Sequence, residues 1–134
     1  MQTNSGTETI LIVDHEVAIR SIAHMMLTRF GYSVVVADSA KSALELLEWP
    51  GLEVDLALVD VSLASADDVG LSGIHAARPN LPILFLASSV RSEEWEILRA
   101  KRLPYILKPF TSLALTKSVR SVLDKSEGAA SQAL

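Results

Sequence analysis

Two carboxylates and one lysine stand where they could share a site. Asp14, Asp60 and Lys108 each come directly after a short apolar run. Two carboxylates a few ångströms apart repel one another unless a cation lies between them, and carboxylate oxygens suit Mg²⁺ or Mn²⁺. A carboxylate neutralised in this way, beside an ammonium group, can attack an incoming phosphoryl group. These residue types therefore predict phosphoryl transfer to a carboxylate, provided that the fold brings them together.

The elements that must position these residues alternate between two patterns. Short apolar, often β-branched runs predict strands, and apolar residues at helical spacing predict helices. Gly31 stands where the first helix would close, and Ser39 and Ser92 are suited to cap later helices. Strands are expected at 10–13, 34–36, 54–59, 83–86 and 105–107. Helices are expected at about 19–30, 40–47, 69–77 and 112–123, with another after Ser92.

Alternating strands and helices predict an α/β fold with a doubly wound parallel sheet. Five strands that are apolar almost throughout are typical of a sheet covered by helices on both faces. Ligands of such sheets bind beyond the carboxyl ends of the strands, where the strand order reverses. Asp14, Asp60 and Lys108, together with residues 87–89, would lie at that edge. Asp60 is the expected acceptor, because its strand is central and it is the single carboxylate at the strand end.

The length of 134 residues fits a single domain, which we place at residues 9–124. We expect residues 1–8 to be a flexible segment and residues 125–134 to be a disordered tail, since both are small and polar. Residues 1–8 also lack the charged and then apolar order of a signal peptide. No apolar run reaches the length of a membrane span, so we expect a cytoplasmic protein with no membrane contact.

Charge and composition exclude several classes of function. The formal net charge of −4 argues against nucleic-acid binding by this domain, which needs clustered lysine and arginine. The chain has no cysteine, so disulfides, thiolate catalysis and the usual structural zinc sites are excluded. It also has no phosphate-binding loop of the G-x-x-x-x-G-K-[ST] type, which excludes a P-loop nucleotide hydrolase.

Three motifs, in this order, make the sequence resemble the receiver domain of bacterial two-component response regulators. They are Ile-Leu-Ile-Val-Asp14, the run from Val54 to Asp60, and Tyr105-Ile-Leu-Lys108-Pro109-Phe110. The separations also fit the family, with 60 − 14 = 46 residues between the aspartates and 108 − 60 = 48 residues from Asp60 to the lysine. The resemblance covers about residues 9–123. It implies a flavodoxin-like sheet with strand order 2-1-3-4-5.

The resemblance also implies roles for particular residues. Asp60 would be the phosphoacceptor, and Lys108 would contact the phosphoryl group through a loop whose Lys108–Pro109 bond is often cis. Asp14, Asp60 and the backbone carbonyl of Ser62 would hold Mg²⁺ or Mn²⁺. Tyr105 matches an aromatic residue that moves when the domain switches. The donor would be a sensor histidine kinase or a histidine phosphotransfer protein, and the switched surface would bind a downstream protein.

Three positions depart from the family pattern. His15 replaces the second acidic residue after the first strand, where the family commonly has its direct metal ligand. Imidazole suits softer cations better than Mg²⁺, so we expect weak Mg²⁺ binding and relatively better Mn²⁺ binding. Ala87 stands where a threonine or serine is usual, with hydroxyls only at Ser88 and beyond, so we expect weak switching. Ala64 replaces an expected proline.

Other readings of the same residues stay open at this point. One is a pseudo-receiver, an interaction module with the fold and little or no phosphorylation. Another is a flavodoxin-like cofactor protein, although an acidic loop after the first strand repels phosphate. The two aspartates could also be ordinary strand-end residues, and His15 could face solvent without binding a metal. A receiver would at most catalyse phosphoryl transfer to, and hydrolysis from, its own aspartate; it would not be a metabolic enzyme.

Overall fold

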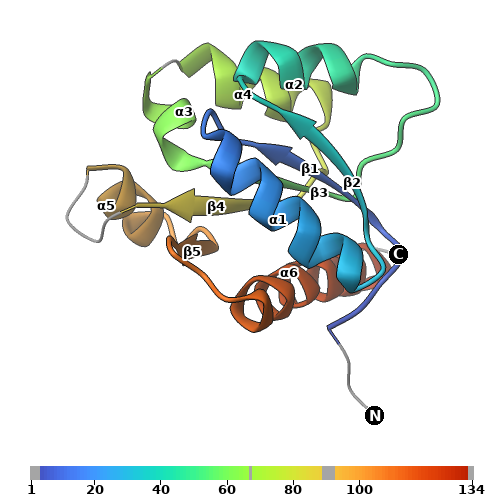
Figure 1. Ribbon diagram of the computed structural model, residues 1–134. Helices are drawn as coiled ribbons and strands as arrows, with labels where there is room; N and C mark the ends of the chain where they lie inside the picture. The colour runs from blue at the N-terminus through green and yellow to red at the C-terminus, as the bar shows by residue number, and fades with distance from the viewer. Residues whose placement is uncertain (1–3, 67, 89–92, 133–134) are drawn as a thin grey trace.

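The central sheet has the predicted strand order. The computed structural model describes residues 4–66, 68–88 and 93–132. A five-stranded parallel sheet has the order β2-β1-β3-β4-β5, which confirms the doubly wound fold (Figure 1). The strands are β1 (Thr9–Val13), β2 (Ser33–Ala37), β3 (Leu56–Asp60), β4 (Ile83–Ala87) and β5 (Tyr105–Leu107).

Helices cover both faces of the sheet. On one face, α1 and α6 pack on the alternate strand residues that include Ile12, Leu58 and Leu86. On the other face, α2, α4 and α5 pack on the intervening residues, which include Val59 and Phe85 (Figure 1). The helices are α1 (Val17–Arg29), α2 (Ala40–Leu47), α3 (Val61–Ala66), α4 (Asp68–Ala77), α5 (Glu93–Ala100) and α6 (Ser112–Gln132). Among the described residues, no helix is long and apolar enough to cross a bilayer.

The predicted turn after the first helix depends on glycine. Gly31 has a φ of +98°, a left-handed conformation that glycine adopts without steric cost. A Cβ at this position would also lie 2.5 Å from the carbonyl oxygen of Gly6. Ser39 caps α2 as expected, since its side chain accepts a hydrogen bond from the backbone N–H of Ser42.

Several boundaries differ from those expected. A helix, α3, begins at Val61, directly after Asp60, where no helix was expected because Gly70 and Gly73 weaken the pattern of the whole segment. The third strand begins at Leu56, not at Val54. The last helix extends past Leu123 to Gln132, so the described part of the expected disordered tail is helical. The expected cap Ser92 lies outside the described residues.

The N-terminal segment makes specific contacts with the domain. Gly6 donates its N–H to the carbonyl of Phe30 at 3.1 Å. The carboxylate of Glu8 receives two hydrogen bonds from the guanidinium of Arg120, at 3.0 and 2.6 Å. The hydrogen bond from Arg120 is the main cause that lowers the pKa of Glu8, partly opposed by burial. Residues 4–8, expected to be flexible, are therefore tied to α1 and α6.

Candidate functional site

The register of the two central strands places the two aspartates side by side. Val13 of β1 pairs with Val59 of β3, and each is followed directly by an aspartate. Because β2 lies on one side of β1 and β3 on the other, the strand order reverses between Asp14 and Asp60. This is the position at which doubly wound folds bind their ligands.

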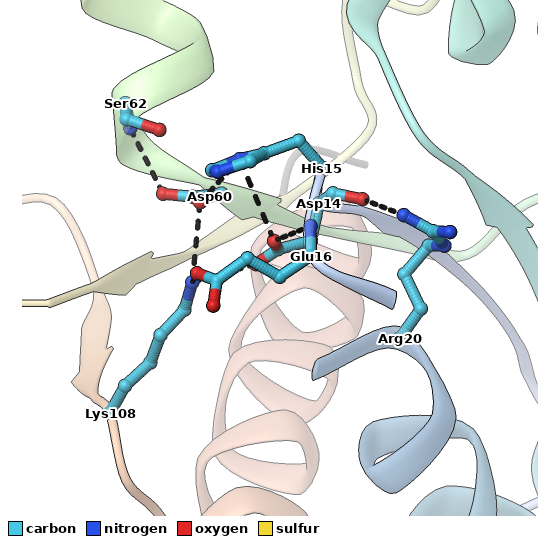
Figure 2. A network of polar contacts seen from close by, with 7 residues as sticks. All are labelled: Asp14, His15, Glu16, Arg20, Asp60, Ser62 and Lys108. Carbon is cyan, nitrogen blue, oxygen red and sulfur yellow. Dashed lines mark hydrogen bonds and ion pairs between the residues drawn. The ribbon is translucent and has the colours of Figure 1, made fainter. Parts of the chain in front are cut away.

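Both aspartates are buried in a polar pocket at the sheet edge. Asp14 is 0% exposed and Asp60 is 2% exposed. Asp14 Oδ1 accepts a hydrogen bond from the backbone N–H of Glu16 at 2.9 Å. Asp60 Oδ1 accepts one from the backbone N–H of Ser62 at 3.1 Å. In each residue the other carboxylate oxygen, Oδ2, faces a shared centre (Figure 2).

Lys108 occupies that shared centre. Its Nζ lies 2.8 Å from Asp14 Oδ2 and 3.2 Å from Asp60 Oδ2. Burial by itself would lower the pKa of Lys108, but the hydrogen bonding of Asp14, the charge of Asp60 and the hydrogen bond of Glu16 outweigh burial and raise it. Lys108 is therefore held as an ammonium that offsets part of the negative charge in the pocket.

Glu16 is a further member of the site, and sequence reasoning did not place it among the site residues. Its Oε1 lies 3.1 Å from Lys108 Nζ, so three carboxylates surround one ammonium (Figure 2). The signal available in the sequence was its place two residues after Asp14, at the expected binding edge. That place did not reveal the direction of a long and flexible side chain.

His15 faces both aspartates from the rim of the pocket. Its Nδ1 is 3.5 Å from Asp60 Oδ2 and 3.9 Å from Asp14 Oδ1, while 59% of its side chain is exposed. One ligand atom from each of Asp14, His15 and Asp60 lies within 4.8 Å of the others, so this acidic triad could hold a metal ion. His15 therefore has the exposed loop position that was expected for it, and its imidazole also lies close to both carboxylates.

The donor set fits a divalent cation. Asp14 Oδ2 is buried, and its contact in the described part of the chain is the ion pair with Lys108 Nζ at 2.8 Å. Buried carboxylates are costly unless positive charge compensates them, and Lys108 supplies one positive charge against the three carboxylates around it. A divalent cation bound by Asp14 and Asp60 would offset the remaining negative charge, and these residues offer it oxygen ligands.

Ser62 follows Asp60 at the start of α3, and the switch positions lie at the end of β4 and on β5. Ser62 is in the first turn of α3, and a helical carbonyl points along the axis toward the C-terminal end of the helix, away from Asp60. The carbonyl of Ser62 would therefore have to turn to reach a cation there. Ala87 is fully buried at the end of β4, and Ser88 after it is exposed. Tyr105 on β5 pairs with Phe85 on β4 and is partly exposed. The Lys108–Pro109 peptide bond is cis.

Comparisons with known proteins agree on one family. The model of the response regulator receiver domain matches residues 10–120. The chain is 30% identical over 125 residues to the sensor kinase CckA of Brucella abortus, covering 92% of this chain and 13% of that protein. It is 35% identical over 103 residues to the transcriptional regulatory protein ZraR of Escherichia coli K12, covering 75% of this chain and 23% of that protein.

Solved structures show the same similarity. A CheY-like response regulator receiver domain protein from Methanospirillum hungatei superposes with a TM-score of 0.77 at 26% identity, covering 92% of this chain and 99% of that one. NtrX from Brucella abortus, with a TM-score of 0.83 at 24% identity, shares the fold; 96% of this chain and 29% of that one are covered. The chain thus spans a small part of several longer relatives. It belongs to the response regulator receiver domain family and is a receiver domain of two-component signalling.

Proposed function

We propose that this domain is a phosphorylation-controlled switch whose acceptor is Asp60. The observation that carries the proposal is the buried carboxylate of Asp60, with the ammonium of Lys108 3.2 Å from its Oδ2 and Asp14 beside it. A buried carboxylate beside an ammonium, at the edge where doubly wound folds bind their ligands, is suited to attack a phosphorylated side chain. The side chains of His15 and Glu16 beside it are partly exposed.

In the proposed reaction, Asp60 Oδ2 attacks the phosphorus atom of a phosphohistidine. A P–O bond forms, the P–N bond to the donor imidazole breaks, and the electron pair of that bond stays on the imidazole nitrogen. Lys108 binds the phosphoryl oxygens, where negative charge is spread in the transition state. The backbone N–H of Ser62 holds the other carboxylate oxygen and so fixes the direction of attack.

A divalent cation, held by Asp14, Asp60 and His15, would neutralise the carboxylates and stabilise charge on the phosphoryl oxygens. His15 offers a nitrogen in place of an anionic oxygen, which supports Mn²⁺ over Mg²⁺ and weak binding of the latter. Ser62 would contribute its carbonyl after a change in the first turn of α3.

The proposed donor is a sensor histidine kinase or a histidine phosphotransfer protein, and the proposed recipient of the signal is a downstream protein. Receiver domains accept phosphoryl groups from histidine kinases. The relatives include a sensor kinase and transcriptional regulators by name, which supports a place in a two-component pathway without deciding which kind of protein follows.

Acetyl phosphate provides the test of acceptor identity. With Mg²⁺ or Mn²⁺ present, we expect one phosphoryl group per chain by mass spectrometry, and none in Asp60→Asn. Asp38→Asn is the matched control, because Asp38 is an exposed acid at the end of the neighbouring strand β2. Equal incorporation by Asp60→Asn and the wild type would refute the assignment of Asp60.

A pseudo-receiver is the second candidate, and two observations favour it. His15 stands where the family has an acid, and Ala87 leaves no buried hydroxyl at the end of β4. In that case the domain would bind its partner without phosphate. Absence of phosphorylation from both acetyl phosphate and a phosphorylated kinase, with the fold intact, would favour this candidate.

A further inference from the structure

Glu16 makes a contact for which the proposed phosphoryl transfer has no use. It occupies the N-cap position of α1, yet its side chain makes no capping hydrogen bond. Glutamate is not among the residues preferred at that position, where asparagine, aspartate, serine and threonine dominate. The carboxylate instead reaches across the pocket to Lys108, whose Nζ donates a hydrogen bond to Glu16 Oε1 at 3.1 Å (Figure 2).

The three carboxylates around Lys108 differ in their freedom to move. The side chains of Asp14 and Asp60 are 0% and 3% exposed, and each accepts a backbone hydrogen bond through its other oxygen. The side chain of Glu16 is 48% exposed. Asp14 and Asp60 are thus fixed by the fold, whereas Glu16 covers the ammonium from the solvent side.

An ammonium has three N–H donors, and three carboxylates lie around this one. A phosphoryl group on Asp60 needs at least one of those donors for its own oxygens. The donor that faces Asp60 Oδ2 becomes available once that oxygen carries the phosphoryl group. The other contact that can open is the one with Glu16, because Asp14 is fixed by the fold. The phosphoryl group is also anionic, so it cannot share the ammonium with the glutamate without electrostatic repulsion.

We propose that Glu16 is a positioning residue that competes with the phosphoryl group for Lys108. The inference rests on the proposed function of Asp60. In the unphosphorylated domain Glu16 covers Lys108 from the solvent side of the pocket. The Glu16 side chain must swing into solvent before the phosphoryl group can engage the lysine fully. Glu16 therefore opposes phosphorylation and makes the unphosphorylated state more persistent.

Two substitutions separate this contact from a simple change of net charge. Glu16→Gln removes the charge, whereas Glu16→Asp keeps it but shortens the side chain by about 1.5 Å, beyond ion-pair reach of Lys108. Asp38→Asn removes a charge at the same sheet edge without touching the lysine. Each protein is titrated with beryllofluoride, a phosphoryl mimic, at fixed Mg²⁺ and ionic strength, and followed by amide chemical shifts. Mg²⁺ affinity is measured separately without the mimic.

We expect Glu16→Gln and Glu16→Asp to bind beryllofluoride roughly twofold to fivefold more tightly than the wild type, the size of a partly exposed ion pair. Phosphorylation by acetyl phosphate should accelerate in parallel, and Asp38→Asn should match the wild type. Mg²⁺ affinity should stay the same in Glu16→Asp and fall slightly in Glu16→Gln, opposite to the effect on the mimic. A merely structural role of Glu16 would not separate the two affinities in this way.

Three results would overturn the proposal. If the wild type binds the mimic and both Glu16 variants bind it equally well, the competition does not exist while the proposed function stands. If Glu16→Asp matches the wild type and only Glu16→Gln differs, net charge is the cause. If neither the wild type nor any variant binds the mimic or gains phosphate, the proposed function is wrong, and so is the role of Glu16.

Discussion

Replacing Lys108 by methionine should show how strongly the site depends on this one ammonium. Methionine keeps the length of the side chain and removes its charge. Asp14 and Asp60 would then be two buried carboxylates, with ligand oxygens within 4.8 Å of each other and no cation between them. At that separation, and with an effective dielectric constant of 20, their repulsion is about 3.5 kcal/mol.

The cost of the substitution should be of the same size. Removing one partner of a buried ion pair typically costs about 3–5 kcal/mol, because the remaining charge is left uncompensated. Only 9% of the Lys108 side chain is exposed, so solvent screening reduces this value little. For a chain of this length, we expect a fall in melting temperature of roughly 10–20 °C. Millimolar Mn²⁺ should restore much of the loss, since a bound cation takes over the neutralising charge.

Urea unfolding at pH 7, with and without Mn²⁺, measures this effect. Lys117→Met is the matched control, because Lys117 lies exposed on α6, and it should change stability by less than about 0.5 kcal/mol. In a double-mutant cycle, Asp14→Asn should remove most of the cost of Lys108→Met. A cost below about 1 kcal/mol for Lys108→Met, independent of Mn²⁺ and of Asp14, would refute the view that the ammonium neutralises a repelling pair.

Three further outcomes are expected. His15→Asp should raise Mg²⁺ affinity about tenfold by adding an anionic oxygen ligand; unchanged affinity in an NMR titration would mean that residue 15 does not face the cation. Ala87→Thr should enlarge the beryllofluoride-induced amide shifts around Tyr105, because a hydroxyl can then move toward the phosphoryl oxygens; equally large shifts in the wild type would make that hydroxyl dispensable. Glu8→Gln should cost about 1 kcal/mol in chemical unfolding by weakening the bidentate pair with Arg120. Since folding lowers the pKa of Glu8, this pair should stabilise the folded state fully above pH about 4.5, and the stabilisation should be lost as the pH falls through the lowered pKa. A difference in unfolding free energy between the two proteins that does not change with pH would contradict this.

The sequence by itself determined the architecture and the edge at which the site lies. Apolar runs and helical spacing are local properties of the chain, and they predict the five strands and their parallel arrangement. The strand order, with its reversal between β1 and β3, was implied by the resemblance to receiver domains. Once that is known, Asp14 and Asp60 must meet, because each directly follows a central strand. Family membership followed from the same motifs.

Local signals were weakest where helix ends depend on neighbours. The pattern between Asp60 and Ala77 contains two glycines, and sequence reasoning placed only one loose helix there. The structure has α3 and α4, with the carboxylate of Asp60 accepting the N–H of Ser62 in the first turn of α3. The Asp60 carboxylate therefore also accepts a backbone N–H that has no intrahelical partner at a helix start.

Only the tertiary structure decided which side chains share the ammonium of Lys108. Glu16 and Lys108 are 92 residues apart, and Glu8 and Arg120 are 112 residues apart. Long charged side chains have many rotamers of similar energy, so no local pattern specifies their partners. Their direction is fixed when packing of α1 and α6 against the sheet brings opposite charges into reach. That packing is what places a third carboxylate on the solvent side of the acceptor site.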